Sequence, residues 1–256
     1  LIAASLVVIV SLGIRQTFGL FFFDFNADLN ISISHFGFVI GLQLLMWGVF
    51  SPVFGFITDR YGGATAIFVS FLFYLAGLFL FYSGLNTGYL FTLTIGLLIG
   101  IGLGGTAISI PVSVVAKHFP SSNRTIATGI VTCAGSFGFF VSPLLVRYSL
   151  IEIGWEITIL YFCFLLGIGL ITALFVSTPK TPVGNNDNNN QTAKEALIEA
   201  FNNKSFIFLT LGFFVCGWHI ALVATHIPTY MMDRGMPDWT AAMILALVGV
   251  FNMIGT

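Results

Sequence analysis

Long apolar runs alternate with short polar breaks along almost the whole chain. A membrane-spanning helix requires about 20 consecutive apolar residues, because the hydrocarbon core of a bilayer is about 30 Å thick. Seven windows meet this requirement, and an eighth begins near residue 239; the seven are 1–23, 36–58, 64–84, 89–116, 124–147, 157–177 and 205–231. The pattern therefore predicts an all-α membrane protein with six spanning helices, a longer polar break, and the first one to two helices of a second set.

The longer polar break, residues 178–204, has a composition of its own. Its centre, VGNNDNNNQ (183–191), is of low complexity and too polar to bury a core, which is typical of a flexible linker. A capping box, Thr192 with Glu195, follows it. The next residues place four apolar side chains on one helical face: Ala196, Leu197, Ala200 and Phe201. We therefore predict a linker that ends in a short helix at the membrane surface.

A weak internal repeat relates the two sets of apolar runs. ADLNISISHFGFVIG (27–41) and MDRGMPDWTAAMILA (232–246) both run from an acidic loop into an apolar helix. Six helices, a linker and a returning pattern are typical of secondary transporters built from two six-helix halves. Because the chain begins and ends inside apolar runs, we expect a piece of a longer protein. Its predicted parts are an N-terminal six-helix bundle, a cytoplasmic linker and the start of a C-terminal bundle: 1–177, 178–204 and 205–256.

Lysine and arginine are distributed unevenly between the two sides of the predicted membrane. Loops rich in these residues face the cytoplasm. If the N-terminus is cytoplasmic, the inner loops carry Arg60, Lys117, Arg124, Lys180, Lys194 and Lys204, and the outer loops carry only Arg147 and Arg234. The distribution therefore predicts a multi-pass protein with a cytoplasmic N-terminus.

Composition supports the membrane assignment and excludes several other classes. Hydrophobic residues make up 57% of the chain and charged residues 7%, whereas soluble domains carry about 25% charged residues. The net charge of −1 excludes a protein that binds nucleic acid through a basic surface. The three cysteines show no paired spacing, so neither a disulfide framework nor a metal site is expected.

The loop between the second and third predicted helices carries a recognisable motif. GFITDRYGG (55–63) resembles the signature G-x-x-x-D-R-x-G of the major facilitator superfamily, with matches at Gly55, Asp59, Arg60 and Gly62. Glycine permits close helix approach and a tight turn, and the charged pair can bond helix ends across the loop. Gly63 and Ala64 stand where the family often has basic residues, which weakens the charge-relay part of the motif. We interpret these residues as a conformational switch.

Three further stretches are similar to the bacterial monocarboxylate-transporter-like branch of this superfamily: SLGIRQTFGLFF, AKHFPSSNRTIATGI and GFFVCGWHIALVATHIPTYMMDRG. The resemblance covers essentially the whole chain. It implies a transporter rather than an enzyme, in the bacterial inner membrane, which moves a small organic anion with protons by alternating access. It implies no cofactor.

GIGLGG (100–105) matches the glycine pattern of dinucleotide sites. Such a site requires a preceding strand and an acidic residue about 20 positions further on, and the sequence predicts neither. Gly96, Gly100 and Gly104 instead lie four residues apart, on one helix face, which predicts a seam of close helix packing. No P-loop is present, so we expect no nucleotide partner.

Arg15 lies near the middle of the first apolar window. A charge at the bilayer centre costs roughly 3 kcal/mol on insertion scales, and the predicted helix interiors contain no aspartate or glutamate that could neutralise it. A guanidinium in a cavity can bind a carboxylate through two hydrogen bonds. The sequence thus predicts a substrate-binding Arg15. The alternative is a structural arginine whose partners are carbonyl groups or an acid elsewhere.

Three more polar residues within the apolar windows are candidates for the transport pathway. His219 and His226 lie seven residues apart, on roughly one face of a helix, and histidine can titrate with protons near neutral pH. Gln43 can contact substrate. The alternative for the histidines is packing against backbone carbonyls, and for Gln43 a hydrogen bond between helices.

The aromatic residues are expected to face lipid for the most part. The chain contains 29 phenylalanines, and Trp155 and Trp239 stand by outer loops, where tryptophan often lies at the membrane interface.

We therefore predict a secondary transporter of a small organic anion, in particular a monocarboxylate, with protons. The alternatives are an exporter of drugs or neutral metabolites, and a membrane sensor or scaffold that has lost transport. Ser142 before Pro143 and Leu144 after it depart from the Gly-Pro pattern of drug antiporters, which favours the first prediction.

Overall fold

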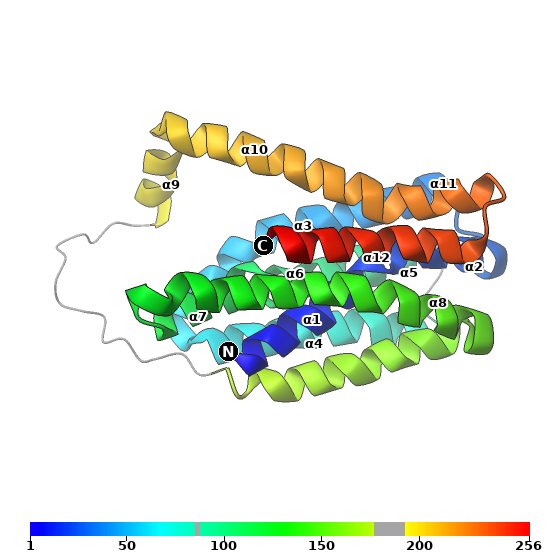
Figure 1. The fold of residues 1–256 in the computed structure, drawn as a ribbon, viewed down its shortest axis with the longest axis horizontal. Coiled ribbons are helices and arrows are strands. Elements are labelled where there is room, and N and C mark those ends of the chain that lie inside the picture. Colours follow the sequence, from blue (N-terminus) through cyan, green and yellow to red (C-terminus); the bar gives the residue numbers. More distant parts are fainter. Residues whose placement is uncertain (85–87, 177–192) are drawn as a thin grey trace.

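The computed structural model describes residues 1–84, 88–176 and 193–256, and within these ranges every regular element is helical (Figure 1). The first four spans comprise α1 (Ile2–Gln16), η1 (Phe18–Phe21), α2 (Phe22–Leu29), α3 (Ile33–Tyr61), α4 (Gly63–Tyr82), α5 (Gly88–Phe91), η2 (Thr92–Leu98), α6 (Ile99–Thr106) and α7 (Ser109–His118). The later elements are α8 (Ser121–Ala173), α9 (Ala193–Asn202), α10 (Lys204–Ala221), η3 (Leu222–His226), α11 (Ile227–Asp233) and α12 (Asp238–Gly255). The predicted all-α membrane fold is confirmed.

Six helical stretches of the described chain are long and apolar enough to cross a membrane. One of them, α8, contains 53 residues. At about 1.5 Å per residue, such a helix would span roughly 80 Å, far more than the hydrocarbon core. Its path reverses at Gly154, whose φ of 79° lies in the left-handed region that glycine adopts without strain. The two arms of α8 in Figure 1 correspond to the predicted windows 124–147 and 157–177.

The predicted linker falls mostly outside the described residues. This holds for the low-complexity stretch and for Thr192, the capping residue. The chain resumes with the short helix α9, which precedes α10. In Figure 1, α10 separates from α12 toward its α9 end, and no residue of α10 is buried.

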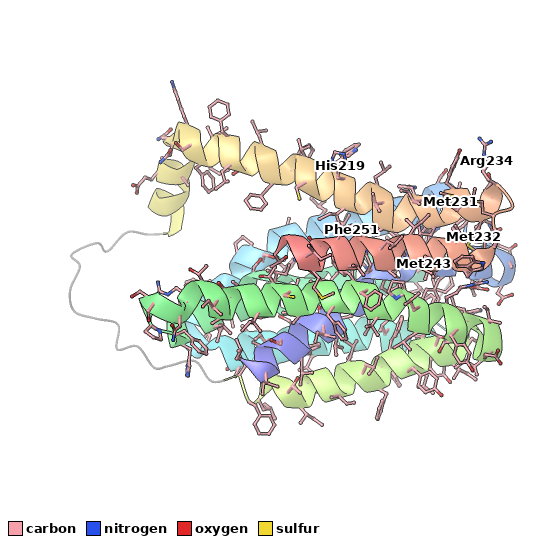
Figure 2. All side chains as sticks on the ribbon, in the orientation of Figure 1. His219, Met231, Met232, Arg234, Met243 and Phe251 are labelled. Carbon is pink, nitrogen blue, oxygen red and sulfur yellow. The ribbon has the colours of Figure 1, made fainter. Side chains whose placement is uncertain are left out.

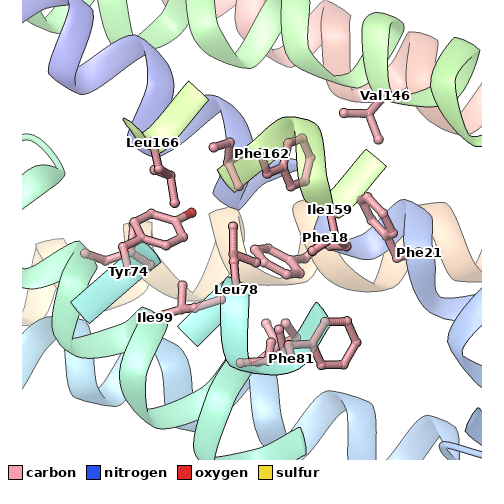
Figure 3. Packing of buried hydrophobic residues seen from close by; sticks show 14 of the residues in the cluster. Phe18, Phe21, Tyr74, Leu78, Phe81, Ile99, Val146, Ile159, Phe162 and Leu166 are labelled. Carbon is pink, nitrogen blue, oxygen red and sulfur yellow. The ribbon is translucent and has the colours of Figure 1, made fainter. Parts of the chain in front are cut away.

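Phenylalanine builds much of the protein interior, although most of the 29 phenylalanines are not buried. Ten are buried, and Figure 3 shows part of this cluster: Phe18, Phe21, Phe22, Phe25, Phe36, Phe54, Phe71, Phe81, Phe91 and Phe162. Edge-to-face pairs favour this packing; the rings of Phe25 and Phe81 are 5.2 Å apart between centroids.

Trp155 belongs to the same cluster, so its side chain faces the protein interior, and its position at the membrane interface stays a prediction. It is only 7% exposed. Its ring packs edge-on against Phe25, with 5.4 Å between centroids, and its Nε1 donates a hydrogen bond of 2.7 Å to Oδ2 of Asp28. Because a buried indole N–H needs an acceptor, this bond ties the turn at Gly154 to the end of α2.

The three glycines spaced by four residues lie against α3. A Cβ at Gly96 would lie 3.3 Å from the carbonyl oxygen of Val39, and one at Gly100 would lie 2.7 Å from that of Gln43. A Cβ at Gly104 would lie 3.0 Å from the backbone of Phe50. The absence of side chains at these positions therefore allows η2 and α6 to pack closely on α3.

The predicted orientation can be tested at the two ends of the bundle. The helices α5 and α9 lie toward opposite ends of the molecule in Figure 1; Tyr89 is 94% exposed at the start of α5, and Asn202 is exposed at the end of α9. In a background without native cysteines, Tyr89→Cys is expected to react with a membrane-impermeant thiol reagent added outside intact cells. Asn202→Cys is expected to react only after the cells are opened. Labelling of both from one side would contradict the predicted topology.

Candidate functional site

A cavity of about 570 Å³ lies between α1 and α8 on one side and α10, η3 and α12 on the other. Its wall is largely apolar, with two carboxamide side chains; the lining residues are Gln16, Phe139, Ile220, Val223, Ile244, Leu247, Val248, Phe251 and Asn252. Figure 2 shows Phe251 on α12. Cavities of this size, apolar with a few polar groups, are typical of sites for small organic molecules.

Close packing of α12 on α8 forms one wall of the cavity. A Cβ at Gly249 would overlap the backbone nitrogen of Phe140 and would lie 2.7 Å from its Cα. Next to this contact, Nδ2 of Asn252 donates a hydrogen bond of 3.1 Å to Oγ of Ser136. These contacts fix the position of Asn252 at the edge of the cavity.

Gln16 is the polar contribution of α1 to the cavity. It is the last residue of that helix, and the helix ends where Thr17 Oγ1 donates a hydrogen bond of 2.8 Å back to the carbonyl oxygen of Ile14. Its side chain is 1% exposed, and its Oε1 has no hydrogen-bond partner among the described residues. A buried carboxamide oxygen normally accepts a hydrogen bond, so this unpartnered oxygen, which is closed off from the cavity, is destabilising in this structure.

Arg15, the neighbour of Gln16, is not among the residues that line the cavity. It is 3% exposed, and its Nε and Nη2 have no hydrogen-bond partner within the described part of the chain. Ser11, one turn earlier on the same helix face, bonds to Thr106 Oγ1 at 2.7 Å and accepts a bond of 3.3 Å from the hydroxyl of Tyr74 at its carbonyl oxygen. Arg15 thus carries a buried charge with two free donors, one residue before the cavity-lining Gln16.

The other predicted binding residues also lie outside the cavity wall. Gln43 is fully buried, and its Nε2 donates a hydrogen bond of 3.0 Å to the carbonyl oxygen of Ile95, which joins two helices. His226 faces α3, where its Cε1 would lie 3.7 Å from a Cβ at Gly37. His219 is exposed on α10 (Figure 2). The structure therefore does not bring Arg15, Gln43, His219 and His226 together.

Sequence reasoning missed Gln16 and Asn252. Each is an uncharged polar residue within an apolar run, and the sequence does not reveal which side of a helix faces a cavity. The adjacency of Gln16 to Arg15 was the one available signal.

The loop motif joins two ends of the helical bundle. Gly62, with a φ of 93°, forms the sharp turn between α3 and α4. Asp59 Oδ1 forms an ion pair of 2.5 Å with Nζ of Lys117 near the end of α7. The guanidinium of Arg60 lies over the ring of Tyr61, 5.5 Å from its centroid, and a Cβ at Gly55 would meet no atom within 4 Å. The pair between Asp59 and Lys117 is thus the interaction that links the loop to another helix.

We predict that Asp59→Asn inserts normally but transports about ten-fold more slowly, equivalent to about 1.4 kcal/mol on the rate-limiting barrier. Stability should change little, because exposed ion pairs contribute at most about 1 kcal/mol, whereas the bond can form only in some states of the cycle. Uptake rates and thermal unfolding of the variant check this. Lys117→Gln is the matched control and should give the same defect; wild-type uptake by Asp59→Asn would remove the switching role.

The two sides of the cavity meet at one end through segments that are not α-helical. There the 3₁₀ segment η1 contacts the π segment η3: a Cβ at Gly19 would overlap the carbonyl oxygen of Ala224 and would lie 3.3 Å from Cγ of Pro228. We call this the η1–η3 contact. Because α10 is unburied and separates from α12 toward α9, α10 diverges from the rest of the bundle toward its α9 end, whereas α12 stays packed on α8 (Figure 1).

Comparison with known proteins gives the family. The profile of the Major Facilitator Superfamily matches residues 4–256. The chain is 24% identical over 245 residues to a hexuronate transporter of Bacillus subtilis (strain 168), covering 89% of this chain and 55% of that protein. It is 24% identical over 237 residues to the probable nitrate transporter NarT of Staphylococcus epidermidis (strain ATCC 35984), covering 90% of this chain and 57% of that protein.

A solved structure shows the same fold. The crystal structure of a D-xylose-proton symporter matches with a TM-score of 0.70 at 16% identity, covering 99% of this chain and 66% of that one. The chain spans about half the length of the curated relatives it matches. The names of these relatives give a hexuronate and nitrate as substrates, so the similarity supports the superfamily and does not extend to the predicted monocarboxylate-transporter-like branch. The match over nearly every residue establishes that this chain belongs to the Major Facilitator Superfamily of membrane transporters.

Proposed function

We propose that the protein is a secondary active transporter that moves a small organic anion, in particular a monocarboxylate, together with protons by alternating access. We place it in the bacterial inner membrane with a cytoplasmic N-terminus. The observation that carries the proposal is the buried guanidinium of Arg15. Two of its donors have no partner in the described chain, and its neighbour Gln16 lines the cavity.

A buried cation without a counter-charge is destabilising, and an anionic substrate removes this cost each time it binds. Arg15 is next to Gln16 in the sequence but points about 100° away from it on the helix, so the proposal requires α1 to rotate between states of the cycle until Arg15 faces the cavity. Two relatives support an anion: one is a hexuronate transporter, and a hexuronate is a carboxylate, and the other is a probable nitrate transporter.

A second candidate, transport of drugs or neutral metabolites, is favoured by the cavity wall itself. No charged side chain lines the described cavity, whose polar groups are two uncharged carboxamides. A neutral apolar molecule would suit such a wall in the state that the structure shows.

Uptake into proteoliposomes tests these functions. The whole protein to which this chain belongs is reconstituted and offered labelled lactate, pyruvate, glucuronate, nitrate and a neutral sugar, with and without an acid exterior. The proposal expects uptake of at least one organic carboxylate, faster when the exterior is acid. Uptake of nitrate alone would contradict the organic substrate, uptake of neutral compounds alone would favour the second candidate, and no uptake would favour a sensor or scaffold.

A further inference from the structure

We propose that Gln43 fixes the position of a movable π bulge in the spanning segment Gly88–His118, and that movement of this bulge opens the η1–η3 contact. The bulge is η2, which lies between α5 and α6. The inference concerns how the transporter changes conformation, so it does not depend on which substrate the protein carries. It gives a role to a buried residue that does not line the cavity.

The first step is a backbone hydrogen bond of η2 that skips one residue. In a regular α-helix the N–H of Ile99 would bond to the carbonyl oxygen of Ile95, four residues earlier. Here it bonds to the carbonyl oxygen of Thr94, five residues earlier. The turn therefore accommodates one extra residue, and the carbonyl of Ile95 loses its usual partner. Such π bulges are rare and are found frequently at functional sites.

Gln43 supplies the partner that the helix backbone no longer provides. From α3, its Nε2 donates a hydrogen bond of 3.0 Å to the carbonyl oxygen of Ile95. Its Oε1 is buried and has no partner among the described residues. An unsatisfied buried oxygen is destabilising, so the state shown here carries a cost that a rearrangement around Gln43 can relieve.

The packing of η2 and α6 on α3 allows the bulge to move. A Cβ at Gly96 would lie 3.3 Å from the carbonyl oxygen of Val39, and one at Gly100 would lie 2.7 Å from that of Gln43. Backbone therefore rests on backbone here, without interlocking side chains from the glycines. A bulge that moves along a helix shifts each residue it passes by about 1.5 Å along the axis and about 100° around it. Glycines at the contact leave room for such a shift.

A row of aromatic rings connects the bulge to the η1–η3 contact. The ring of Phe91, the residue before η2, lies 5.9 Å from that of Phe25 on α2, between centroids. The ring of Phe25 lies 5.5 Å from that of Phe21, the last residue of η1. All three rings are fully buried, and a close-packed interior transmits displacements. A bulge that moves past Phe91 therefore displaces η1, whose Gly19 packs on η3.

Removal of the extra residue tests the bulge. Deletion of Leu93, an exposed residue within η2, permits a regular α-helix in which the N–H of Ile99 bonds to Ile95. Deletion of Leu72, similarly exposed in the regular helix α4, is the matched control and turns one part of that helix by about 100° relative to the other. We expect the Leu93 deletion to insert and remain folded, and the Leu72 deletion to lower the melting temperature much further. Equal destabilisation by both deletions would overturn the bulge.

Reaction of Thr225→Cys with a thiol reagent reports opening of the η1–η3 contact in the whole purified protein without native cysteines. Gln43→Met keeps the size of the side chain and removes the donor. This substitution and the Leu93 deletion are each expected to raise the reaction rate of Thr225→Cys about ten-fold, because both disfavour the state with the bulge at Ile95. Asn202→Cys is the control and should react at the same rate in every variant. An unchanged rate for Thr225→Cys in either variant would overturn the coupling.

A comparison of two backgrounds assigns the effect to Gln43. In the protein with a complete η2, Gln43→Met should lower the melting temperature, because it leaves the carbonyl of Ile95 unsatisfied. In the Leu93 deletion the same substitution should raise the melting temperature, because that carbonyl then has a backbone partner and the carboxamide has none. A loss of similar size in both backgrounds would show that Gln43 has a general structural role and would overturn the inference.

Discussion

Replacement of Gly19 by leucine is expected to lower the transport rate by at least ten-fold while the protein still inserts into the membrane. The η1–η3 contact leaves no room for a side chain, because even a Cβ at Gly19 would overlap the carbonyl oxygen of Ala224. Packed interfaces do not absorb added volume without displacement. A leucine therefore holds η1 and η3 apart and removes the state in which this end of the cavity is closed.

Two measurements check the Gly19 prediction. Uptake by proteoliposomes reports the rate, and reaction of Thr225→Cys with a membrane-impermeant thiol reagent reports whether the η1–η3 end is open. The reagent should react faster in the Gly19→Leu background, and Gly19→Ala should give a smaller effect. Gly167→Leu is the matched control, since a Cβ at Gly167 meets no atom within 4 Å. Wild-type uptake by Gly19→Leu would show that transport does not require this contact.

Removal of the buried charge at Arg15 is expected to weaken substrate binding without lowering the stability of the protein. If the guanidinium binds the substrate carboxylate, Arg15→Lys loses the two-pronged geometry and affinity should fall about ten-fold, or about 1.4 kcal/mol. Arg15→Gln should nearly abolish anion binding. Insertion should become easier, because the cost of placing a charge at mid-membrane disappears.

A structural arginine predicts the reverse pattern for Arg15. In that case Arg15→Gln would leave partner groups unsatisfied and lower thermal stability. Substrate-induced thermal shift and stability in detergent, measured side by side for both variants, decide between the two. Arg234→Gln is the control for charge, since its guanidinium stacks on Tyr230, 5.2 Å from the ring centroid, near the end of α11. A stable Arg15→Gln protein with the wild-type shift would end the binding claim.

The spans of this protein could be predicted from its sequence because their cause is local. A run of about 20 apolar residues is a property of one segment, and the fold class and the two arms of α8 follow from such runs. Gly62 was similarly predictable, since a sharp turn after a charged pair leaves few alternatives to glycine.

The interior of the bundle could not be predicted in the same way. Lipid and protein interior are equally apolar, so a phenylalanine in a spanning helix carries no mark of which one it faces. Trp155 illustrates this, because its position near a loop gave no indication that the structure would bury it against Phe25 and Asp28.

For the candidate site, the sequence likewise could not predict which individual residue faces the cavity. Adjacent residues on an α-helix point about 100° apart, so of Arg15 and Gln16 only one can face a given cavity. Which one does so depends on how α1 packs against α8, a property of the whole fold. The sequence therefore located the polar stretch of α1, and only the structure distinguished the residue on the cavity wall from the residue behind it.

The length of α3 determines how the bilayer itself acts on the loop motif. At about 1.5 Å per residue, its 29 residues span roughly 43 Å, which exceeds a hydrocarbon core of about 30 Å. The helix α3 must therefore tilt or project beyond the hydrocarbon core. If it projects, its end with Asp59 lies among the lipid headgroups. A thicker bilayer draws this end toward the hydrocarbon, where weaker hydration strengthens the attraction between Asp59 and Lys117. The acyl-chain length of the lipids therefore affects the strength of the pair between Asp59 and Lys117. We expect transport rates to differ between vesicles of short-chain and long-chain lipids.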